Sequence, residues 1–256
     1  MALIIEQFTC RTDNFGVLIH DEATRKTAAI DAPELAPIEE RLAARGWNLD
    51  HIFTTHHHED HVEANLALKK AHGCTITGPA READKIPGID MRVSGGDTFY
   101  FGGFEVGVID TPGHTLGHVS YWIPDAKTAF TADTLFSLGC GRMFEGTPEG
   151  FWDSLEKLAA LPEETAIYCG HEYTEANARF ALSVEPENAM LQARAEEVQR
   201  LRSEGKATLP TTIGRERATN PFLRVNEASI RSKLGMGDAP AAAVFGELRR
   251  RKDSFR

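Results

Sequence analysis

Residues 54–61 read Thr-Thr-His-His-His-Glu-Asp-His, and the rest of the chain is organised around this stretch. Four histidines, one aspartate and one glutamate fall within eight residues, directly after an apolar run that ends at Phe53. Buried imidazoles and carboxylates need a partner for every polar atom, and a divalent metal ion supplies such a partner. The order His56-x-His58-x-Asp60-His61 therefore predicts a metal-binding loop rather than a merely solvated one. In a loop, side chains at i and i+2 can converge on one ion while the adjacent Asp-His pair reaches a second.

The composition excludes several classes of protein. The chain has 256 residues and 41% hydrophobic residues, enough for one large domain or a large domain with a smaller one. A formal net charge of −10 argues against a nucleic-acid or anionic-membrane binder. No apolar run approaches the length of a membrane span. The run from Met1 to Phe8 has no basic region and includes Glu6, so it predicts a strand rather than a signal peptide.

The cysteines indicate a reducing compartment. They are far apart and form no Cys-x-x-Cys pair, which predicts reduced thiols in a cytoplasmic protein rather than a disulfide frame. The four residues are Cys10, Cys74, Cys140 and Cys169.

The spacing of apolar residues predicts an α/β domain followed by a smaller helical one. Strands are expected at 3–8, 16–20, 27–30, 51–54, 74–77, 99–101, 104–109, 119–123, 128–131 and 166–169. Helices are expected at 33–45, 62–71, 148–161, 175–184, 186–203 and 239–252. From about Tyr173 the chain is rich in Ala, Glu, Arg and Leu and has no further strand signal. We therefore expect a metal-binding catalytic domain over 1–172 and a helical domain over 173–256.

Three further candidate ligands each follow a predicted strand. His114 lies in a Pro-Gly turn after the strand ending at Ile109. Asp133 follows the predicted strand 128–131, and His171 follows the predicted strand 166–169. Scaffolds of β-strands place functional loops at one edge by this arrangement. A single Gly-His pair is more often an ordinary turn, but together with residues 54–61 these stretches favour one shared site. Asp133 offers a carboxylate that could bridge two ions.

This set of motifs resembles the binuclear site of the metallo-β-lactamase superfamily. Over nearly the whole chain it is similar to one branch, the glyoxalase II (hydroxyacylglutathione hydrolase) family. The motifs that carry the resemblance are THHHEDH at 55–61, GCGR at 139–142, FEGT at 144–147, YCGHEYT at 168–174, NPFLR at 220–224 and RRRKD at 249–253. The resemblance implies an αββα sandwich followed by a small all-helical domain that binds glutathione.

The resemblance also implies the ligand set of two divalent ions, with zinc first and iron or manganese as alternatives. One ion would be held by His56, His58 and His114, the other by Asp60, His61 and His171, with Asp133 bridging them. This ligand count leaves each ion an open position, as catalytic sites require. A water between two ions loses its proton near neutral pH and becomes the nucleophile. Asp60 and Asp133 are then the candidate catalytic carboxylates, and no Ser or Cys nucleophile is needed.

The implied reaction is hydrolysis of S-D-lactoylglutathione and related 2-hydroxyacyl thioesters to D-lactate and glutathione, a step in methylglyoxal detoxification. By resemblance, Arg249 and Lys252 hold the glycine carboxylate of glutathione, and Arg142 and Tyr173 make two more contacts. On residue types alone, the basic run 249–252 is equally well explained as a solvated helix end. Phe144 stands where some members of the family have tyrosine, so a hydroxyl contact is absent there.

Three other functions fit part of the pattern. A lactonase or β-lactamase would need no carboxylate clamp, so the basic run and Tyr173 argue against it. A persulfide dioxygenase resembles this site with one iron, whereas the second ligand set is complete here. A non-catalytic metal-binding module is disfavoured because all seven ligand positions are intact. Among neighbours of the ligands, His57 and Glu59 should point away and His118 should support the site. We expect a monomer with no nucleic-acid or membrane partner.

Overall fold

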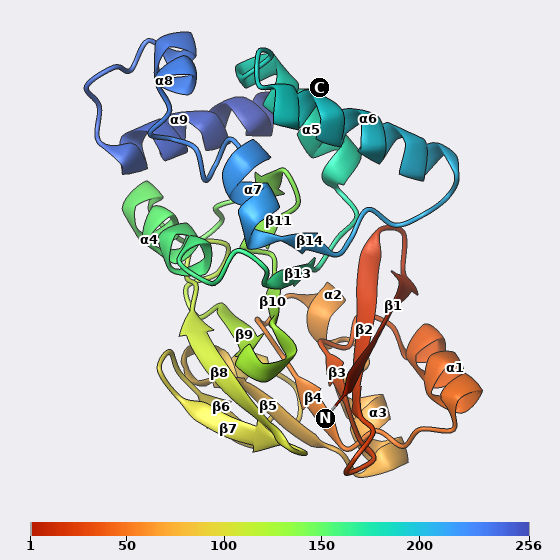
Figure 1. The fold of residues 1–256 in the computed structure, drawn as a ribbon. Coiled ribbons are helices and arrows are strands. Elements are labelled where there is room, and N and C mark those ends of the chain that lie inside the picture. The colour runs from red at the N-terminus through yellow and green to blue at the C-terminus, as the bar shows by residue number, and fades with distance from the viewer. Residues whose placement is uncertain (1, 256) are drawn as a thin grey trace. The chain divides into compact units, whose positions relative to one another are not determined.

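The computed structural model describes residues 2–255 and folds as two compact units (Figure 1). The first unit contains the chain up to Asp110 together with Gly117–Phe130, and the second contains Thr111–Leu116 and the chain from Thr131 onward. Within the described residues, no helix is long and apolar enough to cross a membrane. Each unit contributes part of the predicted ligand set.

A six-stranded mixed sheet forms half of the first unit. Its strands, in spatial order, are β1 (Leu3–Cys10), β2 (Asn14–Asp21), β3 (Lys26–Ile30), β4 (His51–Phe53), β5 (Thr75–Pro79) and β6 (Met91–Val93). The first three are antiparallel, and β3 to β6 run parallel. Parallel neighbours need crossover connections, usually helical, and α1 (Leu35–Arg45) and α3 (Asn65–His72) supply two of them.

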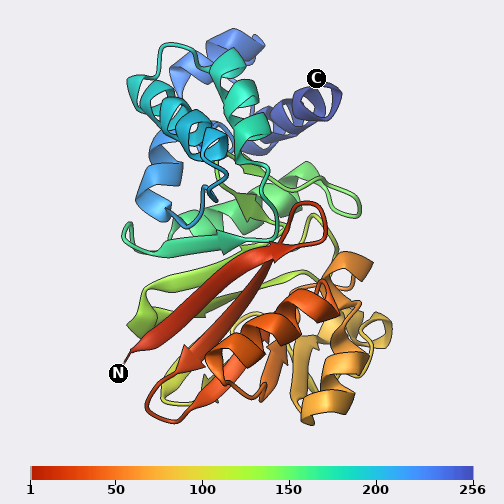
Figure 2. The same ribbon diagram turned by 90° about the vertical axis from the view of Figure 1, so that its right-hand side faces the viewer.

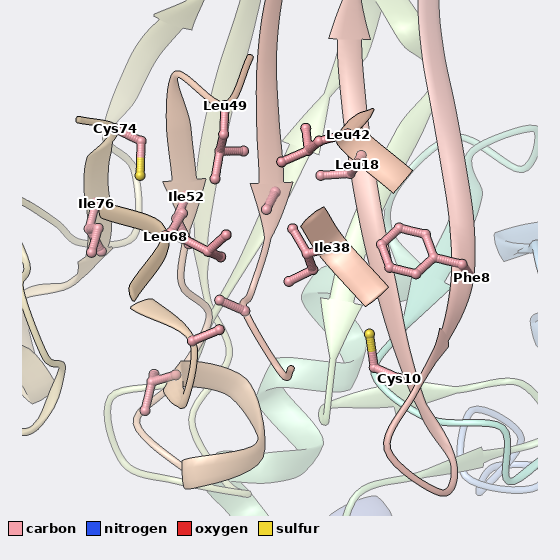
Figure 3. Close-up of a cluster of buried hydrophobic side chains, with 14 of the residues drawn as sticks. Phe8, Cys10, Leu18, Ile38, Leu42, Leu49, Ile52, Leu68, Cys74 and Ile76 are labelled. Atoms are coloured by element: carbon pink, nitrogen blue, oxygen red, sulfur yellow. The ribbon is translucent and has the colours of Figure 1, made fainter. Parts of the chain in front are cut away.

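Helices α1 and α3 cover one face of this sheet with a closed apolar cluster. Figure 2 shows α1 lying along the strands, and Figure 3 shows Ile38 and Leu42 of α1 against Leu18, with Leu68 of α3 beside Ile52. All five side chains are almost fully excluded from solvent. Helix α1 ends at Gly46 in the left-handed region, with φ of 65°, as the sequence predicts.

The predicted helix over 62–71 is wrong at its start. A short helix α2 (Glu59–Val62) begins inside the metal-binding loop, and α3 begins separately at Asn65. Between them the chain is held to the end of β3, because the amide of Ala32 donates to His61 O at 2.8 Å and the amide of Ala64 donates to Ala32 O at 3.0 Å. These bonds keep the loop beside β3 rather than in one continuous helix.

A second sheet has the order β14-β13-β10-β9-β8-β7. In the first unit it comprises β7 (Thr98–Phe101), β8 (Phe104–Asp110), β9 (Val119–Ile123) and the start of β10 (Thr128–Ala132), all antiparallel. Aromatic rings fill the space between the sheets, since Phe53 of β4 lies 5.1 Å from Phe99 and 5.5 Å from Tyr121, between ring centroids. The predicted fold class, a two-sheet sandwich with a helical C-terminal region, is confirmed.

The second unit holds the remaining strands and most of the helices. Its elements are β11 (Leu135–Phe136), β12 (Gly139–Cys140), α4 (Pro148–Ala159), β13 (Ala166–Cys169), α5 (Thr174–Val184), α6 (Ala189–Ser203), β14 (Thr211–Thr212), α7 (Ile213–Thr219), α8 (Ala228–Leu234) and α9 (Ala241–Ser254). The short strands β11, β12 and β14 and the helices α7 and α8 were not expected from the sequence. The domain boundary at 172/173 stays a prediction.

Candidate metal centre

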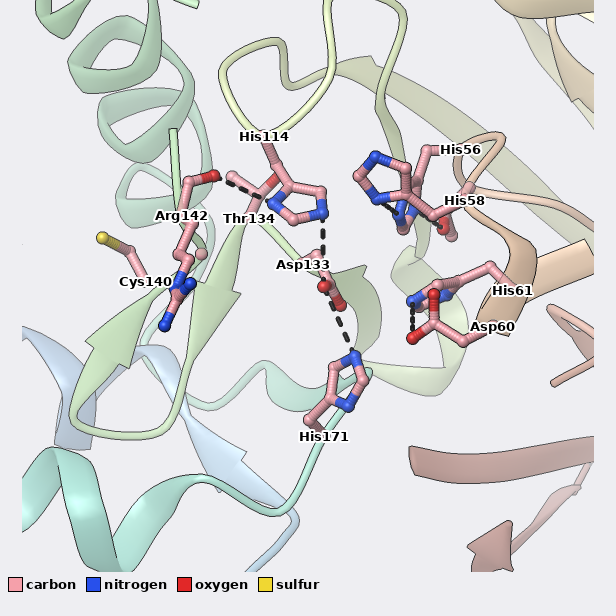
Figure 4. A network of polar contacts seen from close by, with 12 residues as sticks. His56, His58, Asp60, His61, His114, Asp133, Thr134, Cys140, Arg142 and His171 are labelled. Atoms are coloured by element: carbon pink, nitrogen blue, oxygen red, sulfur yellow. Dashed lines mark hydrogen bonds and ion pairs between the residues drawn. The ribbon is translucent and has the colours of Figure 1, made fainter. Parts of the chain in front are cut away.

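The loop after β4 brings the first pair of histidines together. His56 Nε2 lies 3.0 Å from His58 Nδ1, so the i and i+2 side chains converge as the sequence predicts. The start of the loop is fixed by two hydrogen bonds. The amide of Thr54 donates to Thr77 O, and the hydroxyl of Tyr121 donates to Thr54 O at 2.7 Å. Two imidazoles are therefore presented by a rigid strand end (Figure 4).

Asp31 orients a third histidine, and sequence reasoning missed it. This buried carboxylate follows β3, where its φ of 57° lies in the left-handed region, a conformation typical of functional sites. It accepts from the amide of Thr55 at 2.7 Å and the hydroxyl of Thr55 at 2.8 Å, and it lies 2.8 Å from His61 Nδ1. A proton held on Nδ1 leaves the lone pair of His61 on Nε2, the usual arrangement of a metal-ligating histidine.

Asp60 is held by Asn14. The side-chain amide of Asn14, at the β1–β2 turn, donates to Asp60 Oδ2 at 3.0 Å and to Asp60 O at 3.2 Å. Asp60 Oδ2 lies 3.6 Å from His61 Nε2, so both polar atoms point to the same side. The adjacent Asp-His pair is thus pre-arranged within the first unit.

The neighbouring residues lie where the alternation of the loop predicts. His57 turns to Glu82, whose buried carboxylate lies 2.8 Å from His57 Nδ1 and accepts from the amides of His57 and Gly117. Glu59 is exposed. The ring of His118 stacks on that of His56, with 4.9 Å between centroids. Glu82 is a second supporting residue that the sequence did not reveal.

The second unit holds the other three candidate ligands, two histidines around one carboxylate. His114 Nε2 and His171 Nε2 each lie 3.4 Å from the same oxygen, Asp133 Oδ2 (Figure 4). His114 donates from Nδ1 to Arg142 O at 2.9 Å, which directs its Nε2 lone pair to the Asp133 side. The ring of His171 stacks on Tyr173 with 4.8 Å between centroids and 2° between planes.

The donor set suits divalent metal ions. Imidazole nitrogens and carboxylate oxygens are ligands for zinc, iron and manganese. The described residues include three groups of side chains that could each hold an ion: His56, His58 and His114; His56, His61 and Asp133; and Asp60, His61 and His171. These clusters are consistent with a binuclear metal site. Every residue that the sequence singled out as a ligand belongs to one of them.

The four predicted substrate contacts differ in exposure. Arg142 is exposed and Tyr173 is 38% exposed, whereas Lys252 is half-buried and Arg249 is only 5% exposed. Burial, followed by the nearby charges of Arg249 and Arg179, lowers the pKa of Lys252 to about 8. Phe144 is exposed and makes an edge contact with the ring of His114.

None of the cysteines belongs to these three groups of possible ligands. All four are buried and free. Burial raises the pKa of Cys10 to about 12 and those of Cys74 and Cys140 to about 11, and it also raises that of Cys169. Protonated, buried thiols of this kind agree with the expectation that the reaction needs no Cys nucleophile.

Two family models match adjoining parts of the chain. Residues 23–171 match the metallo-beta-lactamase superfamily, and residues 172–255 match the hydroxyacylglutathione hydrolase C-terminus. The hydroxyacylglutathione hydrolase of Brucella anthropi is 62% identical over 253 residues, which cover 99% of this chain and 97% of that protein.

Solved structures show the same fold at lower identity. The crystal structure of ETHE1 from Myxococcus xanthus is 26% identical, with a TM-score of 0.67 over 99% of this chain and 100% of that one. The BLEG-1 B3 metallo-beta-lactamase is 20% identical, with a TM-score of 0.66 over 86% of this chain and 99% of that one, a likeness of fold alone.

Proposed function

The chain belongs to the hydroxyacylglutathione hydrolase family of the metallo-beta-lactamase superfamily, and from this we propose that it hydrolyses S-D-lactoylglutathione and related 2-hydroxyacyl thioesters of glutathione. The products are D-lactate, or the corresponding hydroxy acid, and free glutathione. The observation that carries the proposal is the 62% identity over 99% of the chain. The clusters of histidine and aspartate side chains support the proposal, because they provide the donor atoms that a metal-dependent hydrolase needs.

The seven candidate ligands divide between two ions in this proposal. His56, His58 and His114 would hold one ion, Asp60, His61 and His171 would hold the other, and Asp133 would be shared between them. The approach of two imidazoles to the single oxygen Asp133 Oδ2 supports the bridging role. When bound, such ions lower the pKa of water and polarise a carbonyl oxygen. Zinc is our first expectation, and iron or manganese would fit the same donors.

The chain's own residues prepare the site for this chemistry. Asp31 and the carbonyl of Arg142 keep the Nδ1 protons of His61 and His114, so that both Nε2 atoms are available as ligands. Asn14 fixes the carboxylate of Asp60. The leaving group is a thiolate, which needs less help from a general acid than an amine does. No protonated side chain is therefore required beside the leaving sulfur.

The substrate contacts are all in the second unit. We propose that Arg142, Arg249 and Lys252 face the anionic groups of glutathione and that Tyr173 contacts its backbone. The stacking of Tyr173 on His171 supports this, because a substrate held by Tyr173 would lie beside the proposed metal ligand His171. The positive charge of these residues offsets a chain whose formal net charge is −10. The free, buried cysteines support a cytoplasmic setting.

The decisive experiment compares three substrates. Hydrolysis of S-D-lactoylglutathione is measured beside a lactone and a cephalosporin, each with and without a chelator. We expect rapid thioester cleavage that is abolished by the chelator, with little activity on the other two substrates. Cleavage of the lactone without cleavage of the thioester would keep the metal centre but overturn the proposed substrate.

The pKa of Lys252 makes substrate capture depend on pH. A group with a pKa of about 8 loses its charge as the pH rises through 8. The charges of Arg249 and Arg179 favour the neutral form of this amine, whereas the charge of Asp253 favours the ammonium. Because kcat/KM reports the free enzyme, we expect kcat/KM for the glutathione thioester to fall above pH 8, through a rise in KM.

Two controls separate this effect from the chemistry. The variant Lys252→Arg keeps its charge and should not show the decline. A 2-hydroxyacyl thioester of cysteamine, which has no carboxylate, should show no decline with the unmodified protein either. An identical pH profile for both thioesters would remove Lys252 from the substrate site.

A further inference from the structure

The segment Gly139–Arg142 connects a metal ligand to a predicted substrate contact. Arg142, the last residue of the segment, has an exposed side chain. Its backbone oxygen accepts a hydrogen bond from His114 Nδ1 at 2.9 Å. The position of this short segment therefore sets both the direction of a substrate-binding side chain and the orientation of an imidazole ligand.

Two side chains from the C-terminal helical region hold the segment by its carbonyl oxygens. Arg249 Nη1 donates to Cys140 O at 2.8 Å and to Gly141 O at 3.3 Å. Asn220 Nδ2 donates to Gly139 O at 2.9 Å and to Phe136 O at 3.1 Å. Both side chains are at least 95% buried, so these hydrogen bonds are shielded from competing water.

Arg249 is itself fixed from three sides. Its guanidinium lies over the ring of Phe222, 5.3 Å from the centroid, and its Nη2 pairs with Asp253 at 2.9 Å. Its remaining donors on Nη1 are directed to the segment. This environment differs from that of Arg250 and Arg251 on the same helix, which both pair with Glu247 at the surface.

The segment has no room to absorb a displacement. The amide of Gly141 donates to Thr134 O at 3.2 Å, and a side chain at Gly141 would overlap the backbone oxygen of Asp133. The same added carbon would lie 3.3 Å from His114 Nδ1. A shift of residues 139–142 is thus transmitted to His114 and Asp133 rather than lost in a flexible loop.

We propose that Arg249 and Asn220 are positioning residues for the metal ligand His114, acting through the carbonyl oxygens of Gly139–Arg142. The helical region then determines the affinity of the ion held by His114 as well as the capture of substrate. This inference rests on the proposed function, because it assumes that His114 holds an ion in the working enzyme. It gives Arg249 a task beyond contact with the glutathione carboxylate.

The test measures metal affinity, which a substrate clamp would not influence. In Arg249→Lys the positive charge is kept, but the planar pair of donors is lost. Competition with a chromogenic chelator is used to titrate the two ions of the cobalt-loaded protein. We expect one ion to bind about 10-fold more weakly, the scale seen when a partner of a ligating histidine is removed, while the other is unchanged. The visible absorption of the cobalt protein should shift.

The control and the second variant keep the test decisive. The control is Arg251→Gln, because Arg251 lies on the same helix but pairs with Glu247. This variant should bind both ions as the unmodified protein does. If circular dichroism shows that Arg249→Lys does not fold, the same metal titration is carried out on Asn220→Asp. This substitution keeps the size of the side chain but places a carboxylate oxygen against the carbonyl oxygens of the segment. Unchanged affinity for both ions in the folded variant, with KM alone raised, would overturn the proposal. Failure of the unmodified protein to bind two ions would instead contradict the proposed function.

Discussion

Replacing Asp133 by alanine is expected to leave fewer than two ions per chain and to remove nearly all thioesterase activity. Two candidate imidazole ligands of the second unit approach the same oxygen, Asp133 Oδ2, at 3.4 Å each. Metal ions supply several kcal/mol of charge stabilisation, and each ~1.4 kcal/mol is a factor of ten, so kcat should fall by about 10³-fold or more. Elemental analysis of the purified variant and steady-state kinetics measure the two effects.

Asp133→Asn separates ligation from folding. It keeps the shape of the side chain and removes only its charge, so the variant should remain folded while it too binds fewer ions. Circular dichroism establishes the fold of both variants. Two tightly bound ions together with activity within tenfold of the unmodified protein would contradict the assignment of Asp133 as the shared ligand.

Gly141→Ala is expected to be among the most damaging single substitutions in the chain. The added methyl group would overlap the backbone oxygen of Asp133, and a backbone atom cannot rotate away as a side chain can. Overpacking of this kind costs about 3 kcal/mol or more when the surroundings cannot move. Because the obstruction lies against Asp133 and His114, metal content should fall together with the free energy of unfolding.

Gly237→Ala is the matched control for this substitution. Among the described residues beyond its two chain neighbours, no heavy atom lies within 4 Å of the position that its Cβ would take. Urea unfolding of both variants gives the comparison, and we expect little change for Gly237→Ala. Equal stabilities for the two variants would mean that the segment 139–142 can move. Such mobility would contradict the inference that a shift of this segment displaces His114.

The ligands were accessible to sequence reasoning because their order along the chain reflects strand ends. The convergence of His56 and His58 follows from their spacing, and His114, Asp133 and His171 each follow a strand. Asp31 carries no such signal, since a single aspartate at a strand end is ordinary among 38 acidic residues. Its importance comes from Thr55 and His61, 24 and 30 residues away, which only the folded chain brings to it.

The basic run 249–252 shows a second limit of prediction from the sequence. Its composition predicts cations near the end of a helix, and that is where the run lies. Composition does not tell which side chain is buried, and the structure separates Arg249, enclosed with Phe245 and Leu248, from the surface residue Arg250. The helical spacing of Phe245, Leu248, Arg249 and Lys252 is the signal that could have revealed this difference.

The burial of all four thiols has a consequence for an enzyme that handles acyl thioesters. Its proposed substrate is an acyl donor toward thiolates, and its product is a free thiol that exchanges with disulfides and sulfenic acids. Cys10, Cys74 and Cys140 have pKa values of about 11 to 12, so they are protonated at physiological pH. These thiols are therefore poor nucleophiles for transthioesterification, and their burial protects them against acylation by the proposed substrate and against mixed disulfides with its product.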